Sequence, residues 1–171
     1  MDERIEKALN GQLNAELYSA YLYWAMAAYL KDEDLPGMAN WMENQAKEEL
    51  NHTVRFYKYI GERGGRVTME AIERPPDSWD DVLSLFEDVY AHEQKVTSLI
   101  HALVDLSDEV RDHATSNFLQ WFVAEQVEEE DSAAEVLGKV RRSEGSPQAL
   151  MMVDEQLSQR VAPFVIIPPK V

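Results

Sequence analysis

The 171-residue sequence lacks cysteine, which excludes disulfides, thiolate nucleophiles and cysteine-ligated zinc or iron–sulfur sites. It also lacks an apolar run long enough to span a bilayer, because the longest one, residues 17–30, is short and contains four tyrosines. The first ten residues, MDERIEKALN, are charged and show no secretory signal pattern. We therefore expect a soluble, cytoplasmic protein.

Basic residues are half as numerous as acidic ones. The sequence has 16 Lys and Arg against 32 Asp and Glu, which gives a formal net charge of −16. Nucleic acids and anionic membranes are polyanions, so this charge argues against both as partners. A hydrophobic content of 45% nevertheless predicts one globular domain with a sizeable core.

Glycine and proline are also scarce, with seven of each, and they gather at a few positions in the sequence. The segments between these positions have helical periodicity and no internal proline. The pattern predicts four long helices and a shorter fifth one, at residues 3–31, 37–63, 79–106, 108–142 and 147–160.

Capping residues fit these boundaries. Ser78 is the expected N-cap of the third long helix, and Ser146 followed by Pro147 is expected to begin the short one. A strand pattern occurs only at Phe164–Ile167, between prolines.

The lengths of the connections predict the topology. The first and third links are short, which makes each pair of helices antiparallel. The second link, residues 64–78, can extend to about 50 Å and so run the full length of a helix of about 40 Å. We expect an all-α four-helix bundle with one long crossover plus a short fifth C-terminal helix. Residues 1–160 form this domain, and residues 161–171 form a C-terminal tail.

Each long helix has an inward stripe, traced by steps of three and four residues, that is apolar at its ends and acidic in its middle. The midpoints of similar helices lie at one level of a bundle, so these acids should converge at its centre. The mid-helix acids are Glu16, Glu49, Glu93, Glu125 and Glu129.

Buried carboxylates need a counter-charge. An unpartnered buried carboxylate costs several kcal/mol, and the four stripes contain no Lys or Arg. A bound cation remains, and two divalent metals would balance four carboxylates. Glu49 and His52 form a Glu-x-x-His pair that places an oxygen and an imidazole on one helical face. Such a ligand set suits iron or manganese, with zinc as a competitor.

Three segments carry a family resemblance: NAELYSAYLYWAMAAYL, NWMENQAKEELNHTVRFYKYIGERGGRV and NFLQWFVAEQVEEE. Together they resemble the non-haem ferritins, and the resemblance covers about residues 3–160. It implies a ferritin-like di-iron domain that oxidises Fe(II) with dioxygen or peroxide. It also implies a homo-oligomeric shell of 24 subunits that stores ferric oxide and serves iron homeostasis.

The resemblance also implies roles for individual residues. Glu16, Glu49 and His52 would hold one iron, and Glu49 would bridge to a second. Glu93 and Glu129 would complete the second position.

Further residues match positions around this di-iron centre. Gln126 would lie beside it, while Tyr23 and Trp121 resemble an aromatic pair that can supply electrons. Prokaryotic members have an additional third iron site, and the residues that resemble its ligands are Glu48, Glu125 and Glu128.

Two departures separate the chain from the bacterioferritins. Ser132 stands where their fourth helix would carry the histidine of a second Glu-x-x-His pair. Leu50 follows the bridging glutamate where their haem-ligating methionine would stand, so no haem is expected.

Two alternatives stay open: a di-metal oxidase without a cage, resembling rubrerythrin, and a non-enzymatic helical interaction module.

Overall fold

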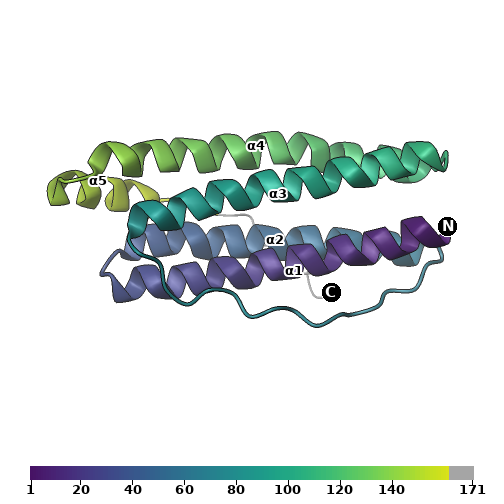
Figure 1. Cartoon of the computed structure of the whole chain (residues 1–171), viewed down its shortest axis with the longest axis horizontal. Helices are drawn as coiled ribbons and strands as arrows, with labels where there is room; N and C mark the ends of the chain where they lie inside the picture. The colour runs from purple at the N-terminus through teal and green to yellow at the C-terminus, as the bar shows by residue number, and fades with distance from the viewer. Residues whose placement is uncertain (162–171) are drawn as a thin grey trace, which may run out of the picture.

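The computed structural model describes residues 1–161, and this part of the chain is helical without strands (Figure 1). The expected C-terminal tail and the strand pattern at Phe164–Ile167 fall outside the described residues, apart from residue 161. No helix in the described range is long and apolar enough to cross a membrane. The helices are α1 Glu3–Asp32, α2 Pro36–Glu62, α3 Val82–Glu109, α4 His113–Ser143 and α5 Pro147–Leu157.

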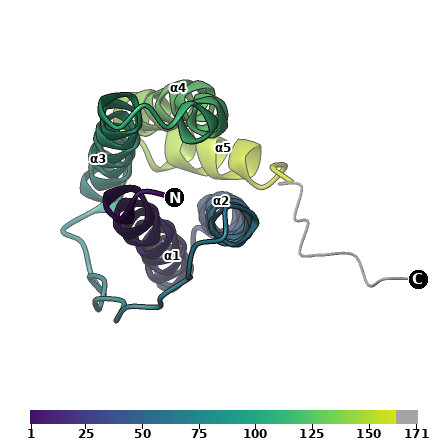
Figure 2. The same cartoon turned by 90° about the vertical axis from the view of Figure 1, so that its right-hand side faces the viewer.

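The four long helices form the predicted bundle. Short links join α1 to α2 and α3 to α4 as antiparallel pairs, and these pairs pack together (Figure 1). The connection from α2 to α3 runs the length of the bundle, which confirms the long crossover. Figure 2 shows this crossover beside α1 and α3, whereas α5 lies against α2 and α4 on the opposite side.

The third long helix begins later than predicted. Asp81, not Ser78, is the N-cap of α3: the amide of Ser84 donates to Asp81 Oδ1 at 2.7 Å. The hydroxyl of Ser84 accepts from the amide of Asp81 at 3.1 Å, which completes a capping box. Both sites fit the general sequence rule, but the reciprocal bond forms only at Asp81.

The break between α3 and α4 also lies later than predicted, at residues 110–112. Arg111 has a φ of 58°, a left-handed conformation that ends α3. Asp112 then caps α4 by accepting from the amide of Thr115 at 3.2 Å. The short fifth helix ends at Leu157 rather than at residue 160, and its predicted cap, Ser146, is confirmed.

The start of α2 depends on α5. Leu35, the N-cap residue of α2, makes no side-chain capping bond. Instead, the amide of Met38 donates to Asp154 Oδ1 of α5 at 2.7 Å. A Cβ on Gly37 would lie 1.8 Å from the carbonyl oxygen of Asp154, so only glycine permits this approach. The contact holds α5 on the bundle.

Two apolar clusters fill the bundle at opposite ends. One includes Met26 and Met38 together with Phe86, while the other includes Leu9 and Phe56. The stripe of each long helix passes from one cluster to the other, as its apolar ends predict. The level between them is where the mid-helix acids lie.

Candidate metal centre

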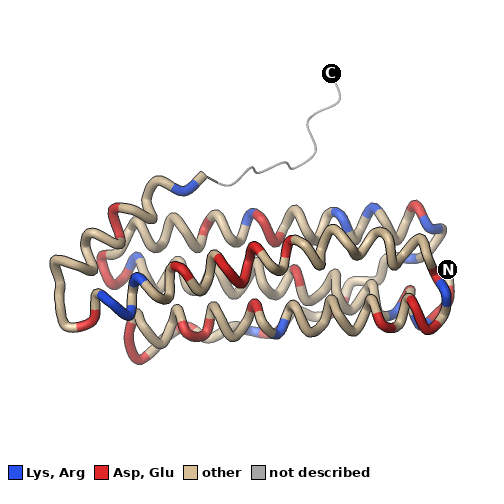
Figure 3. The backbone as a smooth tube through the Cα atoms, turned by 90° about the horizontal axis from the view of Figure 1, so that it is seen from above, with Lys and Arg blue, Asp and Glu red and all other residues tan. Residues whose placement is uncertain are grey.

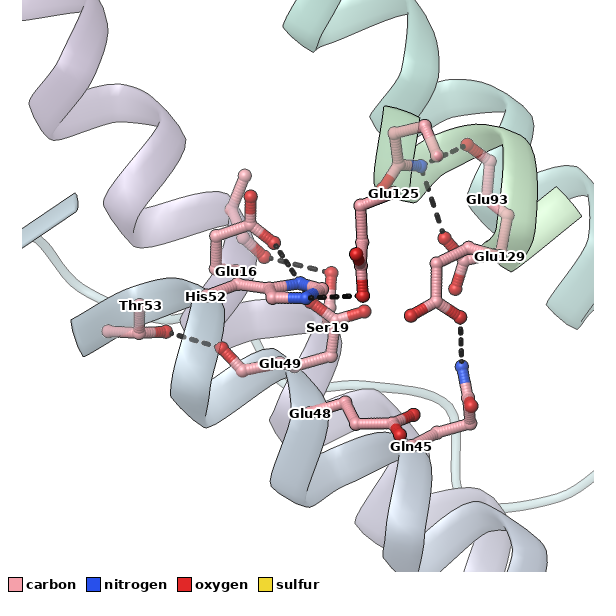
Figure 4. A network of polar contacts seen from close by, with 12 residues as sticks. Glu16, Ser19, Gln45, Glu48, Glu49, His52, Thr53, Glu93, Glu125 and Glu129 are labelled. Atoms are coloured by element: carbon pink, nitrogen blue, oxygen red, sulfur yellow. Dashed lines mark hydrogen bonds and ion pairs between the residues drawn. The ribbon is translucent and has the colours of Figure 1, made fainter. Parts of the chain in front are cut away.

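A layer of buried polar side chains lies between the two apolar clusters. Figure 4 shows members of this layer from close by, among them Glu16, Glu49, His52, Glu93 and Glu129. Every long helix contributes to it, and Glu16, Glu49 and Glu93 are each at most 1% exposed. No Lys or Arg is buried anywhere in residues 1–161. The predicted convergence of uncompensated acids is therefore present. The buried polar residues on the four stripes are Gln12, Glu16, Ser19, Gln45, Glu49, His52, Glu93, Gln126 and Glu129.

Glu16, Glu49 and His52 form the first group of possible metal ligands. One ligand atom from each lies within 4.8 Å of the others. Nδ1 of His52 is 3.4 Å from Glu49 Oε2 and 3.9 Å from Glu16 Oε2. These two carboxylate oxygens are buried and accept no hydrogen bond from the described residues. Two unsatisfied oxygens facing one imidazole nitrogen are the donor set that a cation would complete.

A second group shares the same imidazole. His52, Glu125 and Glu129 also bring ligand atoms within 4.8 Å of one another. Nε2 of His52 is 3.8 Å from Glu125 Oε1, and Glu129 Oε2 accepts from Gln45 Nε2 at 2.9 Å. His52 thus lies between Glu16 and Glu49, which face its Nδ1, and Glu125 of α4, which faces its Nε2.

Glu93 faces this layer from α3 and belongs to neither group. The hydroxyl of Tyr23 donates a short hydrogen bond to Glu93 Oε1, and Nε2 of Gln126 lies 3.4 Å from Glu93 Oε2. Burial, followed by repulsion from Glu129, raises the pKa of Glu93 to about 8. The fully buried Tyr23 and the amide of Gln126 therefore fix the orientation of a carboxyl group that resists ionisation.

The electrostatics of the first group also disfavour negative charge. Burial raises the pKa of Glu16 well above its usual range, and repulsion from Glu49 adds to this. Burial and repulsion from Glu93 do the same to the pKa of Glu49. Acidic positions occur in the middle of the bundle as well as at its ends (Figure 3). A positive ion in the layer would relieve this cost.

His52 differs from these acids because its surroundings favour its charged form. Burial alone would lower its pKa, but the nearby carboxylates of Glu125, Glu16 and Glu129 together outweigh burial, and the pKa is raised. A protonated imidazole is a partial counter-charge for the acids, and metal binding would have to displace its proton.

The three acids matched to a third iron site have different surroundings. Glu48 is half-buried and ion-paired with Arg160, and Glu125 lies beside His52. Glu128 is exposed and joins neither ligand group. The stripe of α4 was predicted to pass through Glu125, but the buried residue at this level is Gln126.

A surface pocket of about 510 Å³ reaches the layer at His52. Its lining includes Glu48 and Glu125 together with the half-buried Trp121. The ring of Trp121 meets His52 edge to face at 5.5 Å, and Arg55 lies 3.6 Å above the indole. The pocket therefore adjoins the cluster at His52, Glu48 and Glu125.

Sequence reasoning missed two kinds of contact. Gln12 donates to Glu16 Oε1 at 2.9 Å, and Gln45 similarly holds Glu129. Their positions on the inward stripes were the available signal. Arg160 gave no signal, because it follows the last helix and meets Glu48 from a distant part of the chain.

Fold and site together define a class: a four-helix bundle protein with a buried, carboxylate-rich cluster around a single imidazole that could hold metal ions. Comparison with known proteins identifies the family. Residues 6–143 match the model of the ferritin-like domain, and the chain belongs to the ferritin family.

Curated relatives agree with this assignment. Bacterial non-heme ferritins of Bacteroides fragilis and Staphylococcus saprophyticus are each 38% identical over 160 residues. The match spans 94% of this chain and 99% and 96% of theirs, respectively. The resemblance to the non-haem ferritins is thereby confirmed.

Solved structures agree as well. The open pore ferritin of Archaeoglobus fulgidus superposes with a TM-score of 0.93 at 48% identity. That match covers 94% of this chain and 99% of the archaeal one. A form of the same ferritin engineered to be closed gives the same TM-score and identity.

Proposed function

We propose that this protein stores iron, by oxidising Fe(II) at the central cluster and holding ferric oxide inside a cage of 24 subunits. Membership of the ferritin family supports iron storage. The observation that carries the oxidation step is the buried layer, in which acids from all four long helices meet one imidazole. No Lys or Arg in the described chain is buried with them. Hard anionic oxygens favour Fe(III) over Fe(II), which makes such a layer suited to oxidation.

In this proposal, Fe(II) is the substrate. Glu16, Glu49 and His52 hold the first ion, and the oxygens of the two glutamates that accept no hydrogen bond are its oxygen donors. Glu49 bridges to a second ion held by Glu93 and Glu129. Two neighbouring irons each give up one electron, so dioxygen or peroxide can accept two electrons at once.

The residues around this centre have supporting roles. Tyr23 donates to Glu93, and Gln126 lies on the same carboxylate, so both orient this ligand. Trp121 packs against His52 and, with Tyr23, is placed to supply electrons. We propose Glu48, Glu125 and Glu128 as ligands of a third iron position, and the cytoplasm as the place of action.

The oxidation step is tested by mixing metal-free protein with Fe(II) in air and following ferric absorbance. Glu49→Gln and His52→Ala should each lower the initial rate at least about tenfold, since each removes a ligand. His101→Ala is the matched control, because His101 is exposed on α3 and should leave the rate unchanged. An unchanged rate in both ligand variants would refute the assignment.

Assembly needs its own measurement. Twenty-four chains of 19.6 kDa should sediment together near half a megadalton. A particle of dimer size would contradict the cage and favour a di-metal oxidase that works without one.

A further inference from the structure

The segment that follows α5 is fastened to α2 beside the metal centre. Nδ2 of Asn40 donates to the carbonyl oxygens of Leu157, Ser158 and Arg160 at 3.3, 3.1 and 3.0 Å. Nδ2 of Asn44 also reaches the carbonyl of Arg160, at 3.1 Å. These bonds fix the backbone at Arg160 and therefore the origin of its side chain.

The side chain of Arg160 extends from this point to the acidic layer. Its Nη2 donates to Glu48 Oε2 at 2.5 Å, and its guanidinium lies 4.6 Å above the ring of Trp41. The side chains of Arg160 and Glu48 are only 22% and 21% exposed. Nη1 of Arg160 is buried and donates no hydrogen bond to any described residue. Arg160 is therefore a partly desolvated cation held mainly by one carboxylate.

Glu48 in turn stands at the outer edge of the cluster. It lines the same pocket as His52 and Glu125. Burial raises the pKa of Glu48, and repulsion from Glu129 raises it further. Attraction by Arg160 acts in the other direction and lowers this pKa. Arg160 thus supplies positive charge at the edge of a cluster of carboxylates that contains no buried Lys or Arg.

We propose that Arg160 is a displaceable internal counter-cation that sets the metal affinity of Glu48. A divalent or trivalent cation that binds the Glu48 carboxylate competes with Arg160 for its negative charge, and two cations that share one carboxylate repel each other. Binding of such an ion is therefore opposed while the guanidinium stays on Glu48 Oε2. This inference rests on the proposed function, because it concerns the outer edge of the same centre.

The consequence is a separation of affinities. The described hydrogen bond and ion pair of the Arg160 side chain both go to Glu48, not to Glu16, Glu49 or His52. The inner cluster should bind metal tightly whatever residue stands at 160. The outer position should bind more weakly while Arg160 is present.

The test uses the assembled, metal-free protein and Zn²⁺, which undergoes no redox chemistry, in isothermal titration calorimetry. Wild type should show a tight class of sites that Glu49→Gln removes and a weaker class. Arg160→Gln should tighten the weaker class about tenfold and leave the tight class unchanged. Arg141→Gln is the matched control, since it breaks an exposed Arg–Glu pair with Glu87 and should change neither class.

A double-mutant cycle identifies the partner. In a Glu48→Gln background, the weaker class should lose affinity, and Arg160→Gln should have no further effect. Arg160→Lys, which keeps the charge but loses the planar donor group, should tighten the weaker class by less than Arg160→Gln. This milder variant also tests the proposal if Arg160→Gln does not assemble, and an affinity at or below wild type would then overturn it.

Three other results would overturn the proposal: an unchanged weaker class in Arg160→Gln, an equal change in the Arg141→Gln control, or a persisting effect in the Glu48→Gln background. A tight class that depends on Glu49 without any weaker class would refute this inference alone. Absence of the tight class would refute the proposed function as well.

Discussion

Replacing Glu93 with glutamine should make the metal-free protein more stable at alkaline pH. Glu93 is fully buried, and its pKa is raised to about 8 by burial and by repulsion from Glu129. Glutamine keeps the shape of the side chain and an oxygen that can accept from Tyr23, but it cannot ionise. The substitution therefore removes a buried charge without opening a cavity.

The magnitude follows from the pKa of the folded state. Because the pKa of about 8 lies above the ordinary 4.5, the folded chain holds a proton that the unfolded chain has lost, and stability falls as pH rises between these values. At about 1.4 kcal/mol per pKa unit, ionising Glu93 removes roughly 5 kcal/mol from the free energy of unfolding. Roughly 4 kcal/mol of this falls between pH 5 and pH 8.5. Wild type and Glu93→Gln should differ little at pH 5 and strongly at pH 8.5.

The assay is thermal unfolding of chelator-treated protein across this pH range, at one protein concentration because assembly also contributes. Asp105→Asn removes an exposed acid from the same helix and should reproduce the wild-type profile. If Glu93→Gln also follows the wild-type profile, Glu93 does not carry a costly buried charge and the electrostatic reasoning is wrong.

Two further substitutions test the contacts that shape the bundle. Gly37→Ala should displace α5, because a Cβ at this position would collide with the carbonyl oxygen of Asp154. The displacement should appear as faster proteolysis of the chain after α4. An unchanged cleavage pattern would contradict this expectation. Asp112→Ala removes the cap of α4 and the partner of Arg63, which should cost about 1–2 kcal/mol in denaturant unfolding. Burial opposes ionisation of Asp112, but the bonds from Arg63 and Thr115 together outweigh it and lower the pKa of Asp112. The stabilisation should therefore be lost as pH falls through the acidic range, and a pH-independent difference would contradict this.

Periodicity alone was sufficient to predict the level and the inward direction of Glu16, Glu49 and Glu93. Steps of three and four residues follow one face of a straight helix, and helices of similar length place their midpoints together. The same steps placed Glu129 of α4 correctly but failed one turn earlier, where Gln126 and not its neighbour Glu125 is buried. Packing against α3 turns Gln126 inward, where its amide lies 3.2 Å from Thr97 Oγ1.

Contacts that depend on tertiary structure could not be predicted. Ser78 and Asp81 both satisfy the capping rule, and the reciprocal bonds form only between Asp81 and Ser84. The ion pair of Arg160 with Glu48 joins residues 112 positions apart, one of them in irregular chain, where no periodicity operates. The capping of α2 by Asp154 is hidden for the same reason.

The most direct test of the central claim is to locate iron itself. Crystals of metal-free protein, soaked anaerobically with Fe(II), should give anomalous difference density at the iron edge within the buried layer. We expect one peak bounded by Glu16, Glu49 and His52, and a second peak on the Glu93 side of Glu49. Anomalous density confined to surface acids, with none in the layer, would contradict this expectation.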